Sequence, residues 1–558
     1  MGIFDKQELR KLEGQEDQQR KKINKELTEN VEIKSQVSLD CGIPVKSYYT
    51  PLDIKDAHVC LPGTYPYTSA TDSLGYRRGF WAMGMTSGYA TAAESNQRYR
   101  DIIEAGTTYV NTAMDLPTHM GLDSDHPLAA GEVGKTGIPF CTVRDMLDLF
   151  DGVPVEKLSI LGCHTNVIAP VFLGMFIVML EEHGIEPGSF RVRLHNDPLP
   201  QFVVRGHYTI PPDGAMRLHG DVTEYCTKNL PAWISMMICG AHFREAGSTI
   251  VQQIAFILAN AIAYIREGLR RGLIVDDFMR NVHTFMFIHR NLFEEVAGLR
   301  ALRRIWAKTL KESFHASDEE TCKCKIFAQL GGSTLTRQQP LNNIVRMTTE
   351  ILAAVLGNVM NVSTSTYDEA YALPTTESAI LGLRAQQIVA NESGATDVVD
   401  PLAGSYYVEY LTDEIEARVS ELLEKIEAVG GAVEAVKSGF YHKEVAGAAY
   451  ELQKRIENKE KIVVGVNEYI SKAQPPPFET FELNEKSEAQ QIERLNEVRR
   501  KRDNKKVHVC LKRLREALES DENIIPSIIE GVRAYASVGE IGQVFRDIYG
   551  EYQPYTGI

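Results

Sequence analysis

The sequence has few cysteines, no feature of a secreted protein and no apolar run long enough to cross a bilayer. Nine cysteines occur among 558 residues without regular spacing, which favours reduced thiols in a cytoplasmic protein. Cys322 and Cys324 have no second Cys/His pair nearby, so we predict no metal site there. The N-terminus lacks the apolar segment of a signal peptide, and the stretch from Val167 to Leu180 is short enough to predict a buried helix.

Several catalytic signatures are also missing. No GxGxxG follows a predicted strand, which disfavours a Rossmann dinucleotide site. Gly134-Lys135-Thr136 resembles the end of a P-loop, but the glycine required five residues before Gly134 is Ala129. No GxSxG or HExxH occurs, which excludes the hydrolase and metalloprotease patterns that carry them.

An excess of positive charge is absent as well. The net charge of −15 makes the chain a poor candidate for wrapping a nucleic-acid backbone. The basic run 499–506 has acidic neighbours, so we interpret it as a solvated helix face rather than a nucleic-acid site. Hydrophobic residues at 44% and charged residues at 24% indicate a globular protein. The length fits an α/β barrel of roughly 200–250 residues with an appendage.

Four regions differ in composition. Residues 1–36 form a charged arm with eight Lys/Arg and eight Asp/Glu, which is either a frayed terminus or an arm that orders on a partner chain. Residues 37–82 are rich in Pro, Gly, Tyr and Thr and predict an extended segment. In it, Arg77 and Arg78 lie beside aromatics and are candidate ligand-binding residues. Residues 83–400 are expected to form the main α/β domain, and residues 401–558 a helical C-terminal region.

Short β-branched or apolar runs alternate with helical patterns across residues 83–400. The predicted strands are 83–87, 107–113, 158–162, 191–195, 233–239, 283–288, 326–330 and 358–363. Predicted helices between them include 93–105, 168–184, 246–269, 293–312 and 341–356. Alternating strands and helices indicate a parallel sheet, and eight repeats favour a closed (β/α)8 TIM barrel over an open sheet.

The strand pattern stops near residue 400. Apolar residues then recur at spacings of three and four, at Leu411, Ile415, Val419, Leu422, Ile426 and Val429. This is one face of a helix, which Gly430-Gly431 should end. Residues 484–520 predict a further helix.

Active sites of such barrels lie at the C-terminal ends of the strands. Polar residues there are Thr86, Asp115, His195, Arg205, His242, Gln329 and Glu369. An arginine, two histidines and a glutamine could bind an acyl or carboxylate group.

Long segments of the chain resemble one family. They are YATAAESNQRYR, MDLPTHMGLDSDHPLAAGEVGKTG, HNDPLPQFVVRGHYTIPP, CGAHFREAGS, LTRQQPLNNIVR, DEAYALPTTES and VVDPLAGSYYVE. They resemble the methylmalonyl-CoA mutase family from about residue 45 to the C-terminus. The resemblance implies adenosylcobalamin-dependent radical isomerisation of an acyl-CoA that lies along the axis of a TIM barrel. Cobalamin is expected to cap the mouth of the barrel, held by a separate flavodoxin-like domain.

One departure concerns that separate domain. Its DxHxxG signature, with the histidine that ligates cobalt, is missing, because His126 follows Asp125 directly. The chain therefore resembles the large subunit of a split mutase. We expect a small cobalamin-binding partner that carries DxHxxG, in a heterodimer or a heterotetramer. The charged arm and the helical C-terminal region are candidate docking surfaces for it.

The resemblance also assigns roles to residues. His242 matches a histidine that contacts the thioester carbonyl, and Arg205 matches an arginine that pairs with the free carboxylate of the substrate. Arg300 matches an arginine near the CoA phosphates, and the segment with Arg77 and Arg78 is placed on the CoA side. Positions that face the corrin or the adenosyl group are Gln329, Glu369, Ala370, Ala372, Glu245, Val204, Leu116 and Gly332. We count Gln329 with His242 and Arg205 as catalytic candidates.

Five positions depart from the family pattern. Thr86 and Ala241 stand where tyrosines are expected, His195 replaces a glutamine near the thioester, Ser333 replaces a tryptophan over the corrin, and Gly84 replaces an arginine near CoA. The lost aromatics predict a larger acyl pocket unless neighbours fill the space.

The substrate expected from these departures is bulkier than methylmalonyl-CoA and carries a carboxylate for Arg205. Hydroxyacyl-type relatives have an acidic residue where this chain has Ala113, which disfavours 2-hydroxyisobutyryl-CoA. Isobutyryl-, ethylmalonyl- and pivalyl-type substrates stay open. The other readings are a non-catalytic paralogue that binds acyl-CoA and, with less support, a cobalamin-independent barrel lyase.

Overall fold

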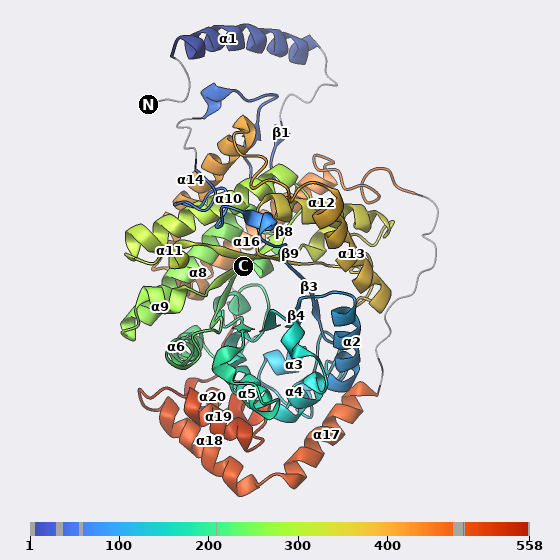
Figure 1. Cartoon of the computed structure of the whole chain (residues 1–558), viewed down its shortest axis with the longest axis vertical. Helices are drawn as coiled ribbons and strands as arrows, with labels where there is room; N and C mark the ends of the chain where they lie inside the picture. The colour runs from blue at the N-terminus through green and yellow to red at the C-terminus, as the bar shows by residue number, and fades with distance from the viewer. Residues whose placement is uncertain are drawn as a thin grey trace.

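The computed structural model describes residues 6–29, 37–54, 60–207, 209–471, 484 and 486–555. At its centre lies one parallel sheet whose strands run in the order β6-β5-β4-β3-β10-β9-β8-β7 (Figure 1). The strands are β3 (Ala82–Ser87), β4 (Tyr109–Thr112), β5 (Ile160–Cys163), β6 (Val192–Leu194), β7 (Met237–Cys239), β8 (His283–Ile288), β9 (Lys325–Leu330) and β10 (Asn361–Ser363). Hydrogen bonds from Leu194 N to Ile234 O (3.0 Å) and from Met237 N to His195 O (2.8 Å) join β6 to the start of β7 and close the barrel.

Helices follow the strands in alternation and cover the outside of the barrel. They are α2 (Ala92–Glu104), α4 (Val143–Phe150), α5 (Ala169–Glu182), α6 (Pro212–Asn229), α8 (Ile250–Arg270), α10 (Leu292–Lys308), α12 (Asn342–Leu356) and α13 (Thr376–Glu392). The predicted (β/α)8 barrel is confirmed. β8 has the predicted bounds, whereas β7 and β10 start four and three residues later than predicted, at Met237 and Asn361, where ladder pairing begins.

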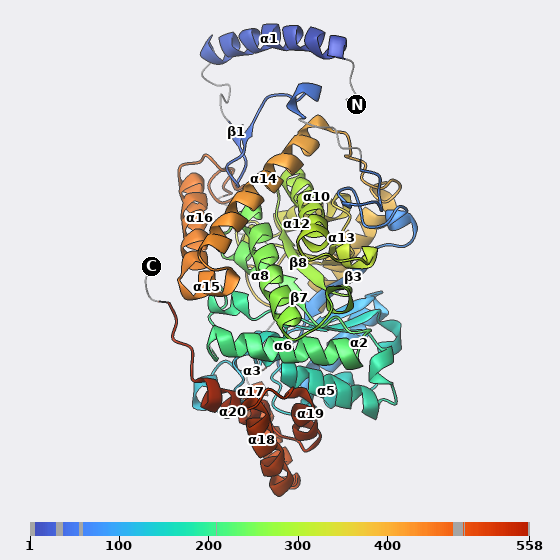
Figure 2. The same cartoon turned by 90° about the vertical axis from the view of Figure 1, so that its left-hand side faces the viewer.

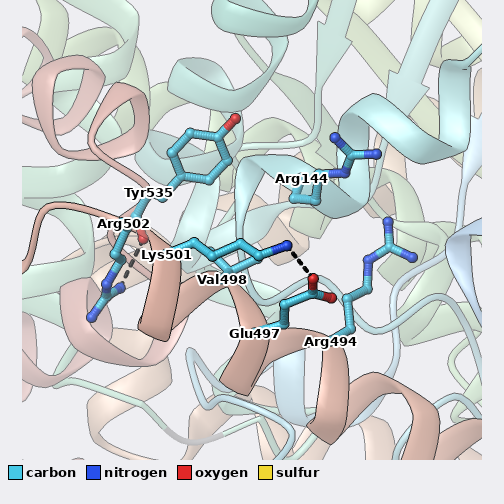
Figure 3. Close-up of a pocket in the computed structure, with 7 residues that line it drawn as sticks. All are labelled: Arg144, Arg494, Glu497, Val498, Lys501, Arg502 and Tyr535. Atoms are coloured by element: carbon cyan, nitrogen blue, oxygen red, sulfur yellow. Dashed lines mark hydrogen bonds and ion pairs between the residues drawn. The ribbon is translucent and has the colours of Figure 1, made fainter.

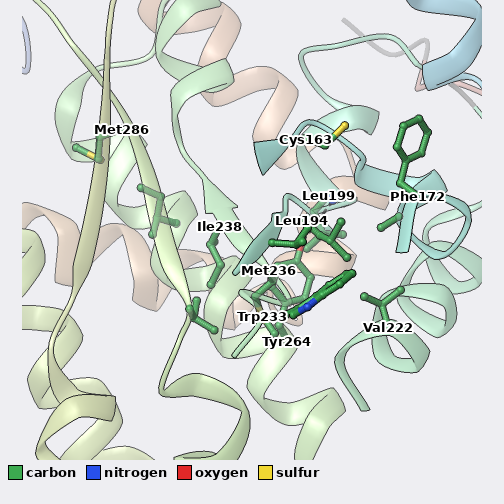
Figure 4. Packing of buried hydrophobic residues seen from close by; sticks show 14 of the residues in the cluster. Cys163, Phe172, Leu194, Leu199, Val222, Trp233, Met236, Ile238, Tyr264 and Met286 are labelled. Atoms are coloured by element: carbon green, nitrogen blue, oxygen red, sulfur yellow. Dashed lines mark hydrogen bonds between the residues drawn. The ribbon is translucent and has the colours of Figure 1, made fainter. Parts of the chain in front are cut away.

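Two elements show how local sequence sets the boundaries. α8 begins at Ile250 rather than at residue 246, because Thr249 and Gln252 form a capping box that fixes its first turn. Every residue of α5 from Ala169 to Leu180 is buried, which confirms the predicted buried helix. Figure 4 shows the packing between the barrel wall and its helices, where Phe172, Leu194, Val222, Trp233 and Tyr264 are among the cluster. No helix among the described residues is long and apolar enough to cross a membrane.

The N-terminal region lies outside the barrel. Helix α1 (Lys6–Glu29) is mostly exposed and stands away from the strands (Figure 2). β1 (Val37–Ser38) and β2 (Pro44–Val45) form a small antiparallel ladder, and the following chain is mostly irregular, as predicted. Arg303 of α10 is buried and donates hydrogen bonds to the carbonyls of Tyr67, Thr68 and Ser69 and to that of Gly357. One arginine thus fixes the extended segment near the N-terminal ends of the strands.

The C-terminal region is helical, as predicted, in two groups. α14 (Tyr406–Ala428), α15 (Ala432–Lys437) and α16 (Phe440–Glu457) lie beside α8 and α10. The predicted apolar face of α14 is buried except at Val429, which is 40% exposed because the helix has ended at Ala428. Gly430 and Gly431 follow with positive φ angles of 105° and 86°, which a glycine adopts without steric cost.

The second group lies on the opposite side, against α5 and α6 (Figures 1 and 2). It consists of α17 (Ser487–Lys501), α18 (Asn504–Leu518), α19 (Ile525–Arg533) and α20 (Val538–Tyr549). The helix predicted over 484–520 is therefore two helices. The chain turns at Arg502, which is extended, and Asp503 caps the second helix.

The basic run 499–506 is only partly the solvated face that we predicted. Arg499 pairs with Asp123 at 2.7 Å and with Asp125 at 2.5 Å, and Arg502 pairs with Glu540 at 2.5 Å. The remaining basic residues of the run are exposed. The two arginines hold α17 against the barrel and against α20.

A cavity of about 530 Å³ lies between α4 and α17 (Figure 3). Its lining residues are Arg144, Arg494, Glu497, Val498, Lys501, Arg502 and Tyr535. Its cations already pair inside the chain, Arg144 with Asp148, Lys501 with Glu497 and Arg502 with Glu540. We therefore assign no ligand to this cavity.

Asp123 joins the second helical group to the long loop after β4. Its buried carboxylate accepts hydrogen bonds from Ser537 Oγ (2.5 Å), Gly539 N (2.8 Å) and Arg499 Nη2 (2.7 Å). Arg546 of α20 donates to the carbonyl of Gly121 in the same loop, at 3.1 Å. The C-terminal helices thus brace a loop that forms part of the barrel mouth.

Replacing Asp123→Ala should lower the free energy of unfolding by about 3 kcal/mol, because Arg499 and the Ser537 hydroxyl lose a buried partner. Hydrogen exchange should speed up in α20 and in residues 116–140. The control is Asp125→Ala, which removes a more exposed partner of the same arginine and should cost less than about 1 kcal/mol. Equal effects of the two variants would contradict the proposed brace.

Candidate functional site

A chamber of about 240 Å³ opens at the C-terminal ends of the strands. It is lined by Ala113, Met114, His119, Thr136, His164, Arg205, His242, Phe285, Phe287 and Gln329. Four of these are residues that the sequence predicted: Ala113, Arg205, His242 and Gln329. They come from the ends of four different strands or the loops after them, as a shared mouth requires.

Arg205 and His242 form the centre of the chamber. Arg205 Nη1 lies 2.6 Å from His242 Nε2, and Cys239 Sγ lies 3.1 Å from His242 Nδ1. An arginine side chain only donates, so Nε2 of His242 must accept. The proton of the neutral ring is therefore on Nδ1 and points to the Cys239 sulfur. Among the described residues, no carboxylate pairs with Arg205.

Further histidines surround this pair. His164 follows β5 and His195 follows β6, and their ring centroids are 3.9 Å apart. His119 and His207 stack at 4.9 Å. Burial lowers the pKa of His119, His164, His195 and His242 well below the usual value, and the positive charge of Arg205 adds to this. Burial and Arg205 lower the pKa of His207 to about 3. The chamber is lined by neutral imidazoles around one cation.

A second group of predicted residues lies at the rim of the mouth. Ser333 donates from N (2.8 Å) and from Oγ (3.0 Å) to the carboxylate of Glu245. A Cβ at Gly332 would lie 3.5 Å from both Glu245 and Glu369, so these three positions adjoin one another. Desolvation by the surrounding protein, with the like charge of Glu245, raises the pKa of Glu369 to about 7. Leu116, Val204 and Ala372 are half-buried and Ala370 is exposed, which leaves a face open to a covering group.

This arrangement, an eight-stranded barrel with an arginine–histidine pair at its mouth, agrees with the comparison to known proteins. A family model described as methylmalonyl-CoA mutase matches residues 39–551. The chain belongs to the methylmalonyl-CoA mutase family. Members of this cobalamin-dependent family are mutases, a class of isomerases that transfer a group within one molecule.

One of the similar proteins is named as a large subunit, and others are named simply as methylmalonyl-CoA mutases. The 2-hydroxyisobutanoyl-CoA mutase large subunit of Aquincola tertiaricarbonis is 36% identical over 526 residues, which cover 94% of this chain and 93% of that protein. The methylmalonyl-CoA mutase of Rhizobium meliloti is 38% identical over 515 residues, covering 92% of this chain and 72% of that protein. The human mitochondrial methylmalonyl-CoA mutase is 35% identical over 513 residues, covering 92% of this chain and 68% of that protein.

Some residues assigned from the family lie away from the chamber. Arg300 is buried in α10 and pairs with Asp400 and with Glu409 (2.7 Å), so its guanidinium is already neutralised within the chain. Arg77 and Arg78 are exposed just before β3, at the other end of the barrel, and Arg78 pairs with Asp72 at 3.1 Å. The structure does not bring these three arginines together with His242.

Other predicted residues lie in or under the mouth without lining the chamber. His195 and Ala241 are fully buried beneath it. The backbone of Thr86 in β3 pairs with that of Asn111 in β4, whereas the side chain of Thr86 lies outside the part of the chain that the structure describes. Asp115, expected at the mouth for its polarity, instead accepts hydrogen bonds from Thr118 N and Gly134 N, both at 3.0 Å. It caps a turn and fixes the loop after β4.

Three histidines that line the chamber or stack beside it were not predicted as site residues. His119 and His207 lie inside the segments that resemble the family, but their position within the barrel is not visible from their spacing. His164 could have been found, because it follows β5 as His195 follows β6. The predicted strand ended too early, at residue 162. Among the described residues, no group of three or more His, Cys, Asp or Glu side chains could hold a metal ion.

The neutral histidines predict a pH dependence of stability. Each has a depressed pKa in the folded state and an ordinary pKa near 6.5 when unfolded. The unfolded chain therefore binds more protons as the pH falls below 6.5. The free energy of unfolding should decrease by up to about 1.4 kcal/mol per pH unit for each histidine. For His207 this decrease extends from pH 6.5 down to about 3.

The measurement is the free energy of unfolding between pH 7.5 and 5. His207→Gln should reduce the slope below pH 6.5 by the contribution of one histidine. As a control, substitution of the exposed His508 by Gln should leave the slope unchanged. If both variants had the slope of the wild type, His207 would not be held neutral.

Proposed function

We propose that the chain is the large subunit of an adenosylcobalamin-dependent acyl-CoA mutase that catalyses a radical 1,2-rearrangement of the carbon skeleton of its substrate. The observation that carries this proposal is the Arg205–His242 pair in the chamber, with an unneutralised guanidinium 2.6 Å from an imidazole. Such a guanidinium suits a substrate carboxylate, which it can hold by two parallel hydrogen bonds.

The rim residues fit the cofactor chemically. Glu245 and Glu369 offer carboxylate oxygens to amide or hydroxyl donors, and Gly332 lies between them with no side chain to obstruct a flat ring. Adenosylcobalamin, when bound, supplies homolytic radical chemistry. The barrel contributes a walled chamber that limits contact of reactive species with water.

His242 has a defined task in this chemistry. In the structure its Nε2 accepts from Arg205, so it has no proton to give at that atom. A substrate carboxylate would replace Nε2 as the acceptor for Arg205. Nε2 is then free to carry the proton and donate to the thioester carbonyl. Cys239 permits this change, because a thiol can accept from Nδ1–H or donate to Nδ1.

The acyl group that we propose is bulkier than methylmalonyl and carries a carboxylate, as in alkyl-substituted malonyl- or succinyl-CoA. Thr86 and Ala241, in place of the expected tyrosines, support the larger size. Phe285 and Phe287 line the chamber and take up part of that space. On this proposal, Arg205 binds the free carboxylate of the substrate, and the thioester lies elsewhere in the chamber.

The partner that we propose is a small subunit with the DxHxxG histidine, in a heterodimer or a heterotetramer, and we place the complex in the cytoplasm. The near-complete coverage of a relative named as a large subunit supports a separate partner. Helix α1 of the charged arm is mostly exposed, and the arm stays a candidate docking surface. The helices α17 to α20 pack on their own barrel, which leaves only their outer faces for docking.

The same relative makes an isobutyryl- or 2-hydroxyisobutyryl-type mutase subunit the second candidate. Ala113 lines the chamber and supplies no carboxylate for a substrate hydroxyl. Arg205 would have no anion to pair with in the isobutyryl case. These two observations place this candidate second.

Replacing Arg205→Gln should lower kcat/KM for a carboxylate-bearing acyl-CoA by about 100-fold or more, because a desolvated charge pair of this kind is worth about 2–5 kcal/mol. Turnover of an acyl-CoA without a second carboxylate should change little. Arg533→Gln is the control, since Arg533 pairs with Glu181 on the surface. An equal loss on both substrates would contradict the assigned role.

The function itself is tested with the tagged chain recovered from its native lysate with adenosylcobalamin added. We expect a small partner with DxHxxG and isomerisation of one acyl-CoA from a panel, detected by product mass. A partner and bound corrinoid without turnover would favour the non-catalytic paralogue. Absence of any such partner would refute the split-mutase assignment.

A further inference from the structure

A second cleft, of about 510 Å³, lies beside the rim and outside the chamber. We call it the α16 cleft, because α16 forms one wall and the loop between β7 and α8 forms another. Its lining includes Arg244, Ser248, Arg290, Arg455 and Lys461. It shares Glu245 and Ser333 with the rim but no residue with the lining of the chamber. Its volume is in the range of pockets that hold small molecules.

The α16 cleft is rich in cations, three of which already have a carboxylate partner. Asp40 pairs with Lys461 and, at 3.3 Å, with Arg455. Arg244 belongs to the short helix α7 (Ala241–Glu245) and pairs with Glu295 at 3.0 Å. These pairs leave the charge of one further arginine in the cleft uncompensated.

That arginine is Arg290, which follows β8. It makes no ion pair or hydrogen bond within the part of the chain that the structure describes. Burial lowers the pKa of its guanidinium, against the influence of Glu350 and Asp40. Burial also raises the pKa of Glu350 well above its usual value, which favours the neutral carboxyl, and Asp40 is shared by two other cations. A desolvated guanidinium of this kind is costly unless an anion joins it.

The other carboxylates in the lining of the cleft have different roles. Glu245 accepts the two hydrogen bonds from Ser333. Glu444 of α16 accepts from Gln252 Nε2 at 3.1 Å, and Glu451 is exposed. An added anion would therefore pair with Arg290 without displacing an existing salt bridge.

Two buried donors in the lining also lack a partner. Ser248 is 2% exposed, and its hydroxyl makes no hydrogen bond to a described residue. The same holds for Nε of Arg244, whose side chain is 3% exposed. Buried polar groups are nearly always hydrogen-bonded in folded proteins. These two donors therefore indicate a ligand that accepts hydrogen bonds.

The start of α8 adds a positive potential at the same place. Thr249 caps this 21-residue helix and lines the cleft directly after Ser248. The N-terminal end of a long helix carries a partial positive charge, which favours an anion. α16 packs closely against this end, since a Cβ at Gly247 would lie 2.6 Å from Cβ of Ala449. The donors are thus held in place by two packed helices.

We propose that the α16 cleft binds a phosphate group, at a site separate from the chamber. Arg290 pairs with the phosphate, and Ser248 Oγ and Arg244 Nε donate to its other oxygens. A phosphate offers three strong acceptor oxygens to donors from three different elements, whereas a carboxylate offers two. Because the cleft is larger than one phosphate ion, the phosphate of a small organic ester fits it better than free phosphate. The site does not require the mutase reaction.

The test measures binding of glycerol 3-phosphate and of inorganic phosphate to the full-length chain by isothermal titration. We expect both to bind, and the ester to bind more tightly because its glycerol part contacts the wall of the cleft. Equal affinities would assign the site to free phosphate. Glycerol and glycerate are the matched controls, because the first has no anion and the second replaces the phosphate by a carboxylate. Glycerate should bind at least about tenfold more weakly than glycerol 3-phosphate.

Two variants test the residues. Arg290→Gln should weaken binding of glycerol 3-phosphate by about tenfold or more, because a charge-assisted hydrogen bond is lost. Ser248→Ala should weaken it by about threefold to tenfold, on the scale of one hydrogen bond. Arg205→Gln removes the cation of the chamber instead and should leave this affinity unchanged. Thermal melts confirm that each variant is folded.

The opposite results would overturn the inference and leave the proposed function untouched. If Arg205→Gln abolished binding while Arg290→Gln did not, the phosphate would occupy the chamber. If glycerate bound as tightly as glycerol 3-phosphate, the cleft would be a carboxylate site. Absence of binding by either phosphate would leave the cleft to an acidic segment of a partner chain.

Discussion

The site depends on one arginine for which the described chain provides no carboxylate. Arg205 is held near the mouth by a neutral imidazole, and burial together with the charge of Arg205 lowers the pKa of the histidines around it. A cation in such a place is costly unless an anion joins it. The function that we propose supplies this anion as the carboxylate of the substrate. On that proposal, the charge that helps to keep the histidines neutral also selects for a carboxylate.

The rest of the fold fixes the geometry around that arginine. The eight strands place Arg205, His242 and Gln329 at one end of the barrel. Asp123 ties the loop after β4 to the C-terminal helices, and Asp115 fixes the turn within it. At the opposite end, Arg303 binds the extended N-terminal segment through three of its backbone carbonyls. The appended regions thus stabilise the loops of a barrel rather than form separate cores.

Prediction from the sequence succeeded where a pattern is local. The period of α14 and the alternation of strands and helices depend on residues close in the chain. The capping box of α8 is local too, but it was missed, and the helix was predicted to begin four residues too early. Prediction was less successful for single polar residues, because polarity at a strand end does not distinguish a ligand from a loop brace. Asp115 and His242 both follow strands, yet the first accepts two backbone amides and the second faces the chamber.

The sequence by itself determined the barrel, the family and the chemistry expected of His242 and Arg205, because these rest on periodicity and on long motifs. Only the tertiary structure decided that Arg300 is neutralised by Asp400 and Glu409, that His164 belongs to the chamber, and that Tyr109, Arg193 and Phe327 meet on the axis. The physical reason is distance along the chain. Residues from strands that are not neighbours contact one another only when the barrel closes, and no local pattern records which rings then fill its centre.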